Sequence, residues 1–276
     1  MALKAVSKTG VASSVPVSGI TGLGTGVATA LAVNVGTAGA PVTNGGALGT
    51  PVSGTLTNTT DTRWTSHTRQ VFLTGTAATY TTPANVRQLI VRMMGGGGAG
   101  AGSGSTGPNA GATGNSTSFN SIVANGGTGG NGTSGAGGAG GTGGAGSASV
   151  RIAGVAGGNA IWDLVSATQV QLIGGAGAGS GSLAASQGAV AGANAVANSG
   201  GGGGGGGITT TLFANVGNFN QAGGGGSGEY TEIIINSPAA SYTYTVGAAQ
   251  TGASAGTGGN AGGNGASGYI IVDEYY

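Results

Sequence analysis

From Val71 to the end of the chain, short runs of bulky apolar residues alternate with long glycine tracts. The runs are rich in β-branched and aromatic residues, which fit the pleated surface of a strand. The clearest runs read LIVRMM, TEIII, SYTYTV and YIIVDEYY, at residues 89–94, 231–235, 241–246 and 269–276. The pattern predicts a mainly β and irregular chain with almost no α-helix.

One of these runs alternates bulky side chains with hydroxyl side chains. In SYTYTV, Tyr242, Tyr244 and Val246 fall on one face of the strand, and the serine and the threonines fall on the other. Such a strand covers a core on one side only. Residues 236–240 separate it from the preceding strand, and a connection of this length predicts an antiparallel hairpin.

Glycine recurs at every third position in two separate stretches of the chain. This period is typical of a left-handed extended helix with about three residues per turn and no internal hydrogen bonds. The amides of such a helix must bond to neighbouring segments. We therefore predict a packed layer of polyglycine II-type helices, anchored by short antiparallel strands. The structural glycines of the two series are Gly126, Gly129, Gly132, Gly135, Gly138, Gly141, Gly144, Gly256, Gly259, Gly262, Gly265 and Gly268.

Collagen and disorder are the competing explanations of the glycine tracts. Collagen needs proline at about a sixth of its positions or more. This chain has only six Pro, and none lies between Gly126 and Gly144. Tracts rich in Gly and Ser also form flexible linkers when no core holds them. The strands that flank the tracts favour an ordered layer.

Composition divides the chain into three regions. Residues 1–60 are rich in Gly, Thr, Val and Ala, with turn formers throughout, and predict a shaft-like segment of short β-strands. This segment has few large side chains and can bury little apolar surface alone. We therefore expect it to pack against copies of itself or a larger assembly. Residues 61–70 predict a linker or collar in which His67 is solvated. Residues 71–276 form the glycine-rich domain.

Charge and cysteine usage narrow the range of partners. Charged residues make up 5% of the chain, and its seven Lys and Arg and six Asp and Glu give a net charge of +1. Nucleic-acid binding needs clustered basic residues, so we expect no nucleic-acid partner. With no cysteine and one His, we expect neither a disulfide nor a metal site. We also expect no membrane insertion and no export by general secretion, because the sequence lacks a run of about 18 apolar residues and a signal-peptide core.

The sequence gives no support for catalysis. The spacing of the six acidic residues does not support the carboxylate pair of a glycosidase. A Ser-His-Asp arrangement cannot be argued from a single His. GTGGAG at residues 141–146 satisfies GxGxxG, but a chain this rich in glycine matches that motif by chance, and no βαβ unit surrounds it. We predict no enzyme activity and no cofactor.

Residues 70–276 resemble the glycine-rich domain at the distal end of bacteriophage tail fibres and related receptor-binding proteins. Four stretches carry the resemblance, in the order of the family. They read QVFLTGTAATYTTPANVRQLIVRMMGGGGAGAG (70–102), TSFNSIVANGGTGG (117–130), GEYTEIIINSPAASYTYTVGAA (228–249) and GGNAGGNGASGYIIVDEYY (258–276). The first begins as a hairpin whose basic strand runs into glycines. Residues 1–60 also look like the shaft sequence that precedes such tips.

The resemblance implies a homotrimeric tail fibre protein at the exterior of the virion, joined to other tail proteins through its N-terminal segment. Its tip is expected to bind a bacterial outer-membrane protein or a surface polysaccharide during host adsorption. Two features depart from the family. Asn85 replaces a glycine in the turn between the two opening strands, where Asn also tolerates positive φ. Residues 158–186 replace plain glycine repeats with a bulky insert.

Large side chains between the tracts are the candidates for receptor contact, because they supply rigid contact area at low entropy cost. The candidates are Ile161, Trp162, Asp163, Phe213 and Phe219. In a chain with so few large side chains, each could instead fill a core. Tyr242, Tyr244 and Tyr269 are assigned to packing, and Tyr275 and Tyr276 could serve either purpose.

Two other functions fit the composition. The first is a purely structural fibre, cap or decoration protein of the virion, which unchanged host adsorption after deletion of loops within residues 158–219 would favour. The second is an ice-binding or silk-like glycine-rich protein, which thermal hysteresis of the purified protein would favour. The second alternative predicts flat faces with Thr or Ala at one triplet position along the whole chain, whereas strands and the insert interrupt the triplets here.

Overall fold

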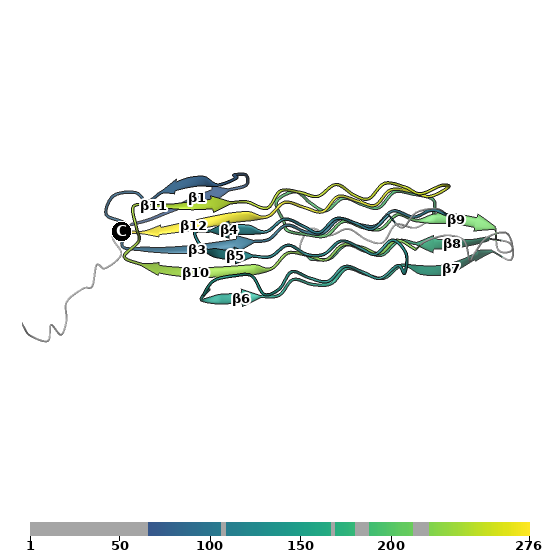
Figure 1. Ribbon diagram of the computed structural model, residues 1–276, viewed down its shortest axis with the longest axis horizontal. Helices are drawn as coiled ribbons and strands as arrows, with labels where there is room; N and C mark the ends of the chain where they lie inside the picture. The colour runs from purple at the N-terminus through teal and green to yellow at the C-terminus, as the bar shows by residue number, and fades with distance from the viewer. Residues whose placement is uncertain (1–65, 106–108, 167–168, 180–187, 212–220) are drawn as a thin grey trace, which may run out of the picture. The chain divides into compact units, whose positions relative to one another are not determined.

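The computed structural model describes residues 66–105, 109–166, 169–179, 188–211 and 221–276 (Figure 1). These residues belong to one unit, Asp61–Tyr276. The predicted fold class is confirmed, because the described residues form antiparallel sheets and extended tracts and contain no helix. The expected shaft-like segment, residues 1–60, lies outside the described residues.

Two antiparallel sheets form a sandwich, and the four strands predicted from apolar runs all lie in it. The five-stranded sheet has the order β1-β12-β3-β10-β6, with bounds β1 His67–Phe72, β3 Gln88–Met94, β6 Val150–Ile152, β10 Tyr230–Asn236 and β12 Tyr269–Tyr275. The four-stranded sheet has the order β2-β11-β4-β5, with bounds β2 Ala78–Thr81, β4 Thr117–Phe119, β5 Ile122–Ala124 and β11 Ser241–Thr245.

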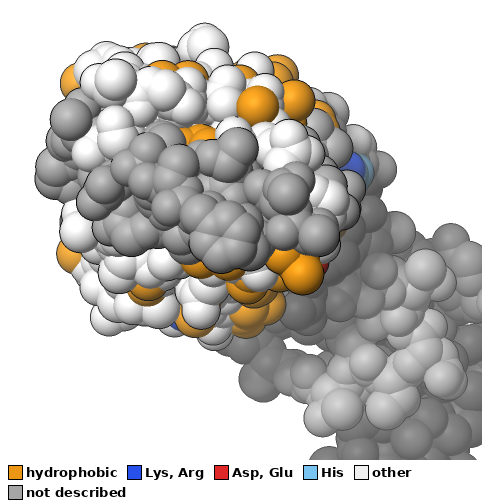
Figure 2. All heavy atoms as spheres, turned by 90° about the vertical axis from the view of Figure 1, so that its right-hand side faces the viewer, with side chains coloured by type: hydrophobic (Ala, Val, Ile, Leu, Met, Phe, Trp, Pro, Cys, Tyr) orange, Lys and Arg blue, Asp and Glu red, His pale blue; other side chains and the backbone are white. Residues whose placement is uncertain are grey.

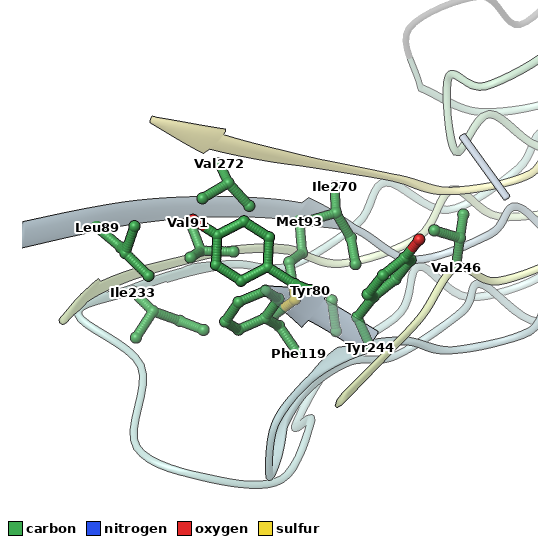
Figure 3. Close-up of a cluster of buried hydrophobic side chains, with 11 residues drawn as sticks. Tyr80, Leu89, Val91, Met93, Phe119, Ile233, Tyr244, Val246, Ile270 and Val272 are labelled. Atoms are coloured by element: carbon green, nitrogen blue, oxygen red, sulfur yellow. The ribbon is translucent and has the colours of Figure 1, made fainter. Parts of the chain in front are cut away.

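The main hydrophobic core lies between these two sheets (Figure 3). The core-facing side predicted for SYTYTV is confirmed, since Tyr244 and Val246 are buried in the core and Tyr242 packs against it. Burying a large apolar side chain contributes about 1.5–3 kcal/mol, so this core stabilises the strands from which the tracts emerge. Its buried members are Tyr80, Leu89, Val91, Met93, Phe119, Ala124, Ile233, Tyr244, Val246, Ile270 and Val272.

The predicted hairpin between residues 231–235 and 241–246 is wrong. β10 pairs with β3 and β6, whereas β11 pairs with β2 and β4. Both edges of each strand are therefore occupied, and Ser237, at a φ of 53°, helps turn the chain from one sheet to the other. The hairpin expected at the start of residues 70–102 is also absent, because its two strands, β2 and β3, lie in different sheets. Asn85 does adopt a positive φ, of 68°, in the turn between them.

Residues 67–70, expected as the end of a linker or collar, form most of β1. This strand pairs with the C-terminal strand β12 in a register that places His67 opposite Tyr275. His67 is exposed, as expected, but it also has partners, since its Nε2 lies 3.1 Å from Asp273 Oδ1 and its ring lies 5.0 Å from that of Tyr275. Such a pairing between distant residues cannot be read from a local composition.

The glycine tracts bond to one another through their backbones. In the tract of residues 95–103, the N–H groups of residues 96, 97 and 98 donate to Asn115, Ala266 and Gly226, each at 2.9 Å. The N–H groups of residues 99, 100 and 101 donate to the same three tracts, at Ala112, Gly263 and Gly223. Every third N–H thus points to the same neighbour. The tract therefore turns once in three residues, as a polyglycine II-type helix does.

The same tract also accepts hydrogen bonds from three further tracts. The N–H groups of residues 127 and 130, 203 and 206, and 253 and 256 donate to its carbonyl groups. Six neighbours therefore surround residues 95–103, all of which are buried. Each of these hydrogen bonds contributes about 0.5–1.5 kcal/mol net. Together they offset the extra entropy that is lost when glycine is ordered, about 0.5–1 kcal/mol per residue relative to alanine.

Interior and surface tracts differ in sequence. The tracts at residues 95–103, 200–207 and 222–228 are buried throughout and consist of glycine with a few alanines and serines. A Cβ at most of their glycines would overlap the backbone of a neighbouring tract. A surface tract instead has one outward position in three, which can carry a side chain. Between residues 126 and 142, apart from the turn at 132–135, the exposed positions are Thr128, Asn131, Ala136, Ala139 and Thr142.

The first glycine series spans two antiparallel tracts joined by a turn. Thr128 N–H donates to Ala139, and Asn131 N–H donates to Ala136, both at 2.9 Å. Gly135, at a φ of 71°, lies in the turn between them. The glycines of the second series lie against every third residue of a neighbouring tract. Added Cβ atoms at Gly259, Gly262, Gly265 and Gly268 would meet Ser103, Gly100, Gly97 and Met94, in that order.

Asp273 on β12 is buried beside Arg69, Arg92 and His67. Arg69 Nε donates to it at 2.6 Å, Arg92 donates to its other oxygen, and His67 Nε2 lies 3.1 Å away. Burial alone would raise the pKa of Asp273, but the hydrogen bonds from Arg69, His67 and Arg92 outweigh burial and hold this pKa below its ordinary value.

We predict that ionised Asp273 stabilises the fold above the pKa of an unfolded aspartate, about 3.9. Because the folded-state pKa is the lower one, this stabilisation is lost as the pH falls through it. The free energy of unfolding of the wild type should therefore drop more steeply between pH 5 and pH 3 than that of Asp273→Asn. Denaturant unfolding across this pH range measures both slopes, and equal slopes would contradict the prediction.

Candidate functional site

A third sheet, of strand order β7-β8-β9, lies at the far end of the tracts from the sandwich (Figure 1). Its bounds are β7 Ile161–Ser166, β8 Gln169–Ile173 and β9 Ile208–Thr211. The chain enters the sandwich at β1 and ends there at Tyr276, whose N–H donates to Ser66. The turn at residues 132–135 touches the base of the third sheet, since Ala160 N–H donates to Gly135 at 2.7 Å. We call this sheet and turn the distal end.

One row of side chains holds the distal sheet together. Trp162, Leu172 and Ile208 stand side by side on β7, β8 and β9. Leu172 and Ile208 are buried and form a small core with Ala160, and Trp162 packs partly buried against it. Trp162, a candidate for receptor contact, is thus only partly available at the surface.

The next row carries three different polar groups. Asp163, Gln171 and Thr209 are neighbours across the three strands, and they supply a carboxylate, an amide and a hydroxyl. Gln171 Nε2 donates to Asp163 Oδ2 at 3.2 Å, and Asp163 is exposed. The remaining lone pairs and N–H groups of this row can hydrogen bond to a polar ligand. Ile161 is 56% exposed beside it.

β7 is an edge strand that carries exposed apolar side chains. Among the described residues it pairs with β8 alone. Leu164 on β7 is 64% exposed, and the sequence IWDLVS contains no Lys, Arg or Pro. Proteins usually protect an edge with such residues. Figure 2, which looks onto this end, shows mainly apolar and uncharged side chains among its described atoms.

The predicted contact residues divide into three groups. Ile161 and Asp163 lie on the exposed side of the distal sheet, Trp162 faces its small core, and Phe213 and Phe219 lie outside the described residues. Leu164, Gln171 and Thr209 were not predicted. The alternation in QVQLI, at residues 169–173, was the available signal for a strand and for the outward direction of Gln171.

A concave feature lies on the side of the tracts. It is a shallow groove of about 380 Å³ lined by Thr113, Gly114, Ser116, Asn125, Gly126, Thr128, Ala139, Gly140, Gly141 and Thr142. The lining has neither a charged group nor an aromatic ring. Hydroxyl groups, peptide groups and the single side-chain amide of Asn125 give little discrimination between ligands, so the distal end is the stronger candidate.

Two buried glutamates have structural partners. Glu274 accepts hydrogen bonds from Tyr80 Oη at 2.7 Å and Gln70 Nε2 at 2.6 Å. Burial, together with this hydrogen bond, raises the pKa of Tyr80 above its ordinary value. Glu229 accepts the N–H groups of Asn125 and Gly144, each at 3.0 Å, and pairs with Arg151 at 3.1 Å. These contacts join strands to tracts and strands to each other.

Within the described residues, no group of three or more His, Asp and Glu side chains could hold a metal ion. The same part of the chain contains no helix that is long and apolar enough to cross a membrane. No family model matches the chain, and no curated protein or solved structure matches it significantly.

Proposed function

We propose that the chain is a phage tail fibre protein whose distal end binds a receptor on the host-cell surface during adsorption. In this proposal residues 1–60 join the virion, and the protein is exposed at the particle exterior. One observation supports it above the others. The sheet β7-β8-β9, with its exposed apolar edge and polar row, lies at the opposite end of the domain from both β1 and Tyr276 (Figure 1).

The lattice suits an adhesive tip for a physical reason. Each tract is fixed by hydrogen bonds to several neighbours, so the layer does not depend on the sequence of the turns that join the tracts. Turns can therefore change or grow while the layer persists, and binding residues are commonly carried by such segments on a rigid scaffold. Here β7 and β8 form an insertion of this kind between two tracts.

The distal end has the chemistry of a contact surface. Ile161 offers apolar area beside the row beginning at Asp163, which offers hydrogen bonds, and Leu164 offers further apolar area on the other face of the same edge strand, a mixture typical of interfaces. An exposed strand edge can also accept an extended segment of a protein by strand addition. An outer-membrane protein fits both features, and a surface polysaccharide fits the polar row.

We predict that Leu164→Asp weakens binding of the full-length protein to susceptible bacterial cells by at least about tenfold, because a central apolar contact contributes about 1–2 kcal/mol or more. The matched control is Val155→Asp, because Val155 is 62% exposed on a surface tract. Fluorescently labelled protein is titrated onto cells from a panel of strains, and a strain that binds the wild type is used for both variants.

Equal binding by the wild type and Leu164→Asp would contradict a contact at this edge. If particles carrying Leu164→Asp, Ile161→Asp and Gln171→Ala together still adsorbed normally, the purely structural fibre or cap would be favoured. Binding to intact cells that survives removal of surface polysaccharide and is lost after protease treatment would identify an outer-membrane protein.

A further inference from the structure

Asp163 differs from the other described acidic residues because its charge has no balancing partner. Glu274 is buried and accepts hydrogen bonds from neutral side chains. Asp163 is exposed, and among the described residues its carboxylate accepts a hydrogen bond only from the neutral amide of Gln171. The remaining three acidic residues are each paired with an arginine: Glu229 with Arg151 at 3.1 Å, Glu232 with Arg92 at 2.9 Å and Asp273 with Arg69 at 2.6 Å.

The distal end cannot balance this charge from its own residues. Lys and Arg are absent from residues 93–150 and 152–276, and the single His of the chain is His67 on β1. These two ranges include every strand and turn of the distal end. Arg151, which separates them, lies on β6 and is already paired with Glu229. The counter-charge for Asp163 is therefore left to a bound molecule.

Ile161 and Asp163 form a pair of unlike groups on one face of β7. They are two residues apart on a strand, which places them about 6.6 Å from each other. Ile161 is 56% exposed and offers apolar area. Gln171 Nε2 donates to Asp163 Oδ2 at 3.2 Å, which orients the carboxylate and leaves further lone pairs for other donors. A Lys or Arg side chain has the matching parts, an apolar stem and a cationic head.

Covering the distal end removes water from the Asp163 carboxylate. A carboxylate that loses water without gaining a cation weakens binding, and the neutral Gln171 does not offset that cost. We propose that the receptor places a Lys or Arg side chain here, with its stem on Ile161 and its charged head on Asp163. This inference rests on the proposed function and selects a protein receptor, because a polysaccharide without amino groups supplies neither the stem nor the cation.

Asp163→Asn tests this pairing, because it removes the charge and keeps an acceptor for Gln171. Glu232→Gln is the matched control, since it removes the same charge from the sandwich. Labelled full-length protein is titrated onto cells of a strain that binds the wild type, in buffer without divalent cations. At about 0.01 M salt, Asp163→Asn should bind at least about tenfold more weakly than the wild type. Glu232→Gln should bind as the wild type does, and Asp163→Glu should retain most of the affinity.

Salt separates an ion pair from a loss of shape. Raising the salt to about 1 M should weaken binding of the wild type toward that of Asp163→Asn, because the charges are then screened. The affinity of Asp163→Asn should change little. Equal or tighter binding by Asp163→Asn at low salt would overturn the inference, since the receptor would then present no cation. Binding that depends on Asp163 but survives protease treatment of the cells would overturn the choice of a protein receptor.

Leu164→Asp distinguishes failure of this inference from failure of the proposed function. Leu164 lies on the same edge strand but on the other face from Asp163. If Leu164→Asp loses binding while Asp163→Asn keeps it, contact at the distal end stands and the inference about the cation fails. If both variants bind as the wild type does, both the inference and the proposed contact fail.

Discussion

Replacing Gly100 by alanine is expected to lower the free energy of unfolding by at least about 3 kcal/mol, the upper part of the range for overpacked interiors. A Cβ at this position would overlap the carbonyl group of Gly204. That oxygen accepts the N–H of Gly263 at 2.7 Å, and Gly100 itself donates to Gly263. The neighbouring backbone cannot retreat without breaking hydrogen bonds, so the clash is not relieved by a side-chain rotation.

Gly143→Ala is the matched control for this variant. Gly143 has a φ of 68°, and an added Cβ there would meet nothing within 4 Å. Only backbone strain remains, which costs about 1–2 kcal/mol. Denaturant unfolding of the two variants and the wild type, followed by intrinsic fluorescence, gives the comparison. If Gly100→Ala were no more destabilising than Gly143→Ala, close packing of the interior tracts would be disproved.

Replacing Glu229 by alanine is expected to destabilise the protein by about 3–5 kcal/mol, because it removes one partner of a buried ion pair. Glu229 is 2% exposed. Its carboxylate accepts the N–H groups of Asn125 and Gly144, which belong to two different tracts, and pairs with Arg151. The variant would leave both N–H groups and the guanidinium without this acceptor at the junction of β10 with the tracts.

Glu232→Ala tests whether burial of the carboxylate is the reason for the large loss of stability expected for Glu229→Ala. Glu232 lies three residues away, and its side chain is 22% exposed. Its partner Arg92 keeps a second contact with Asp273. The loss should be at most about 1 kcal/mol, as for ion pairs near the surface. Similar unfolding free energies for the two variants would show that Glu229 does not fix the junction.

Local patterns predicted the elements of this fold whose geometry depends on near neighbours. Gly126 and Gly129 reveal the three-residue turn because each inward position must lack a side chain. The alternation around Tyr244 revealed its core face. The pairing of the strands could not be predicted from such local patterns. Ser237 directs β11 away from β10, and this depends on partners that are distant in sequence.

Local patterns also predicted part of the candidate site. Ile161, Trp162 and Asp163 stood out as bulky residues among glycines, but their composition does not tell which faces a core. The neighbours Leu172 and Ile208 decide that Trp162 packs inward. Ile208 follows a glycine tract of residues 200–207, and only the folded lattice brings it beside β8.

Amide hydrogen exchange of the native protein tests the lattice most directly, because it reports whether each N–H has a lasting partner. The amides of Gly98, Gly203 and Gly225, which donate to neighbouring tracts in the interior, should exchange orders of magnitude more slowly than those of unstructured glycine. The amide of Gly126, which has no hydrogen-bond partner among the described residues, should exchange much faster. Fast exchange at all four positions would contradict the account, because the glycine tracts would then not form an ordered scaffold.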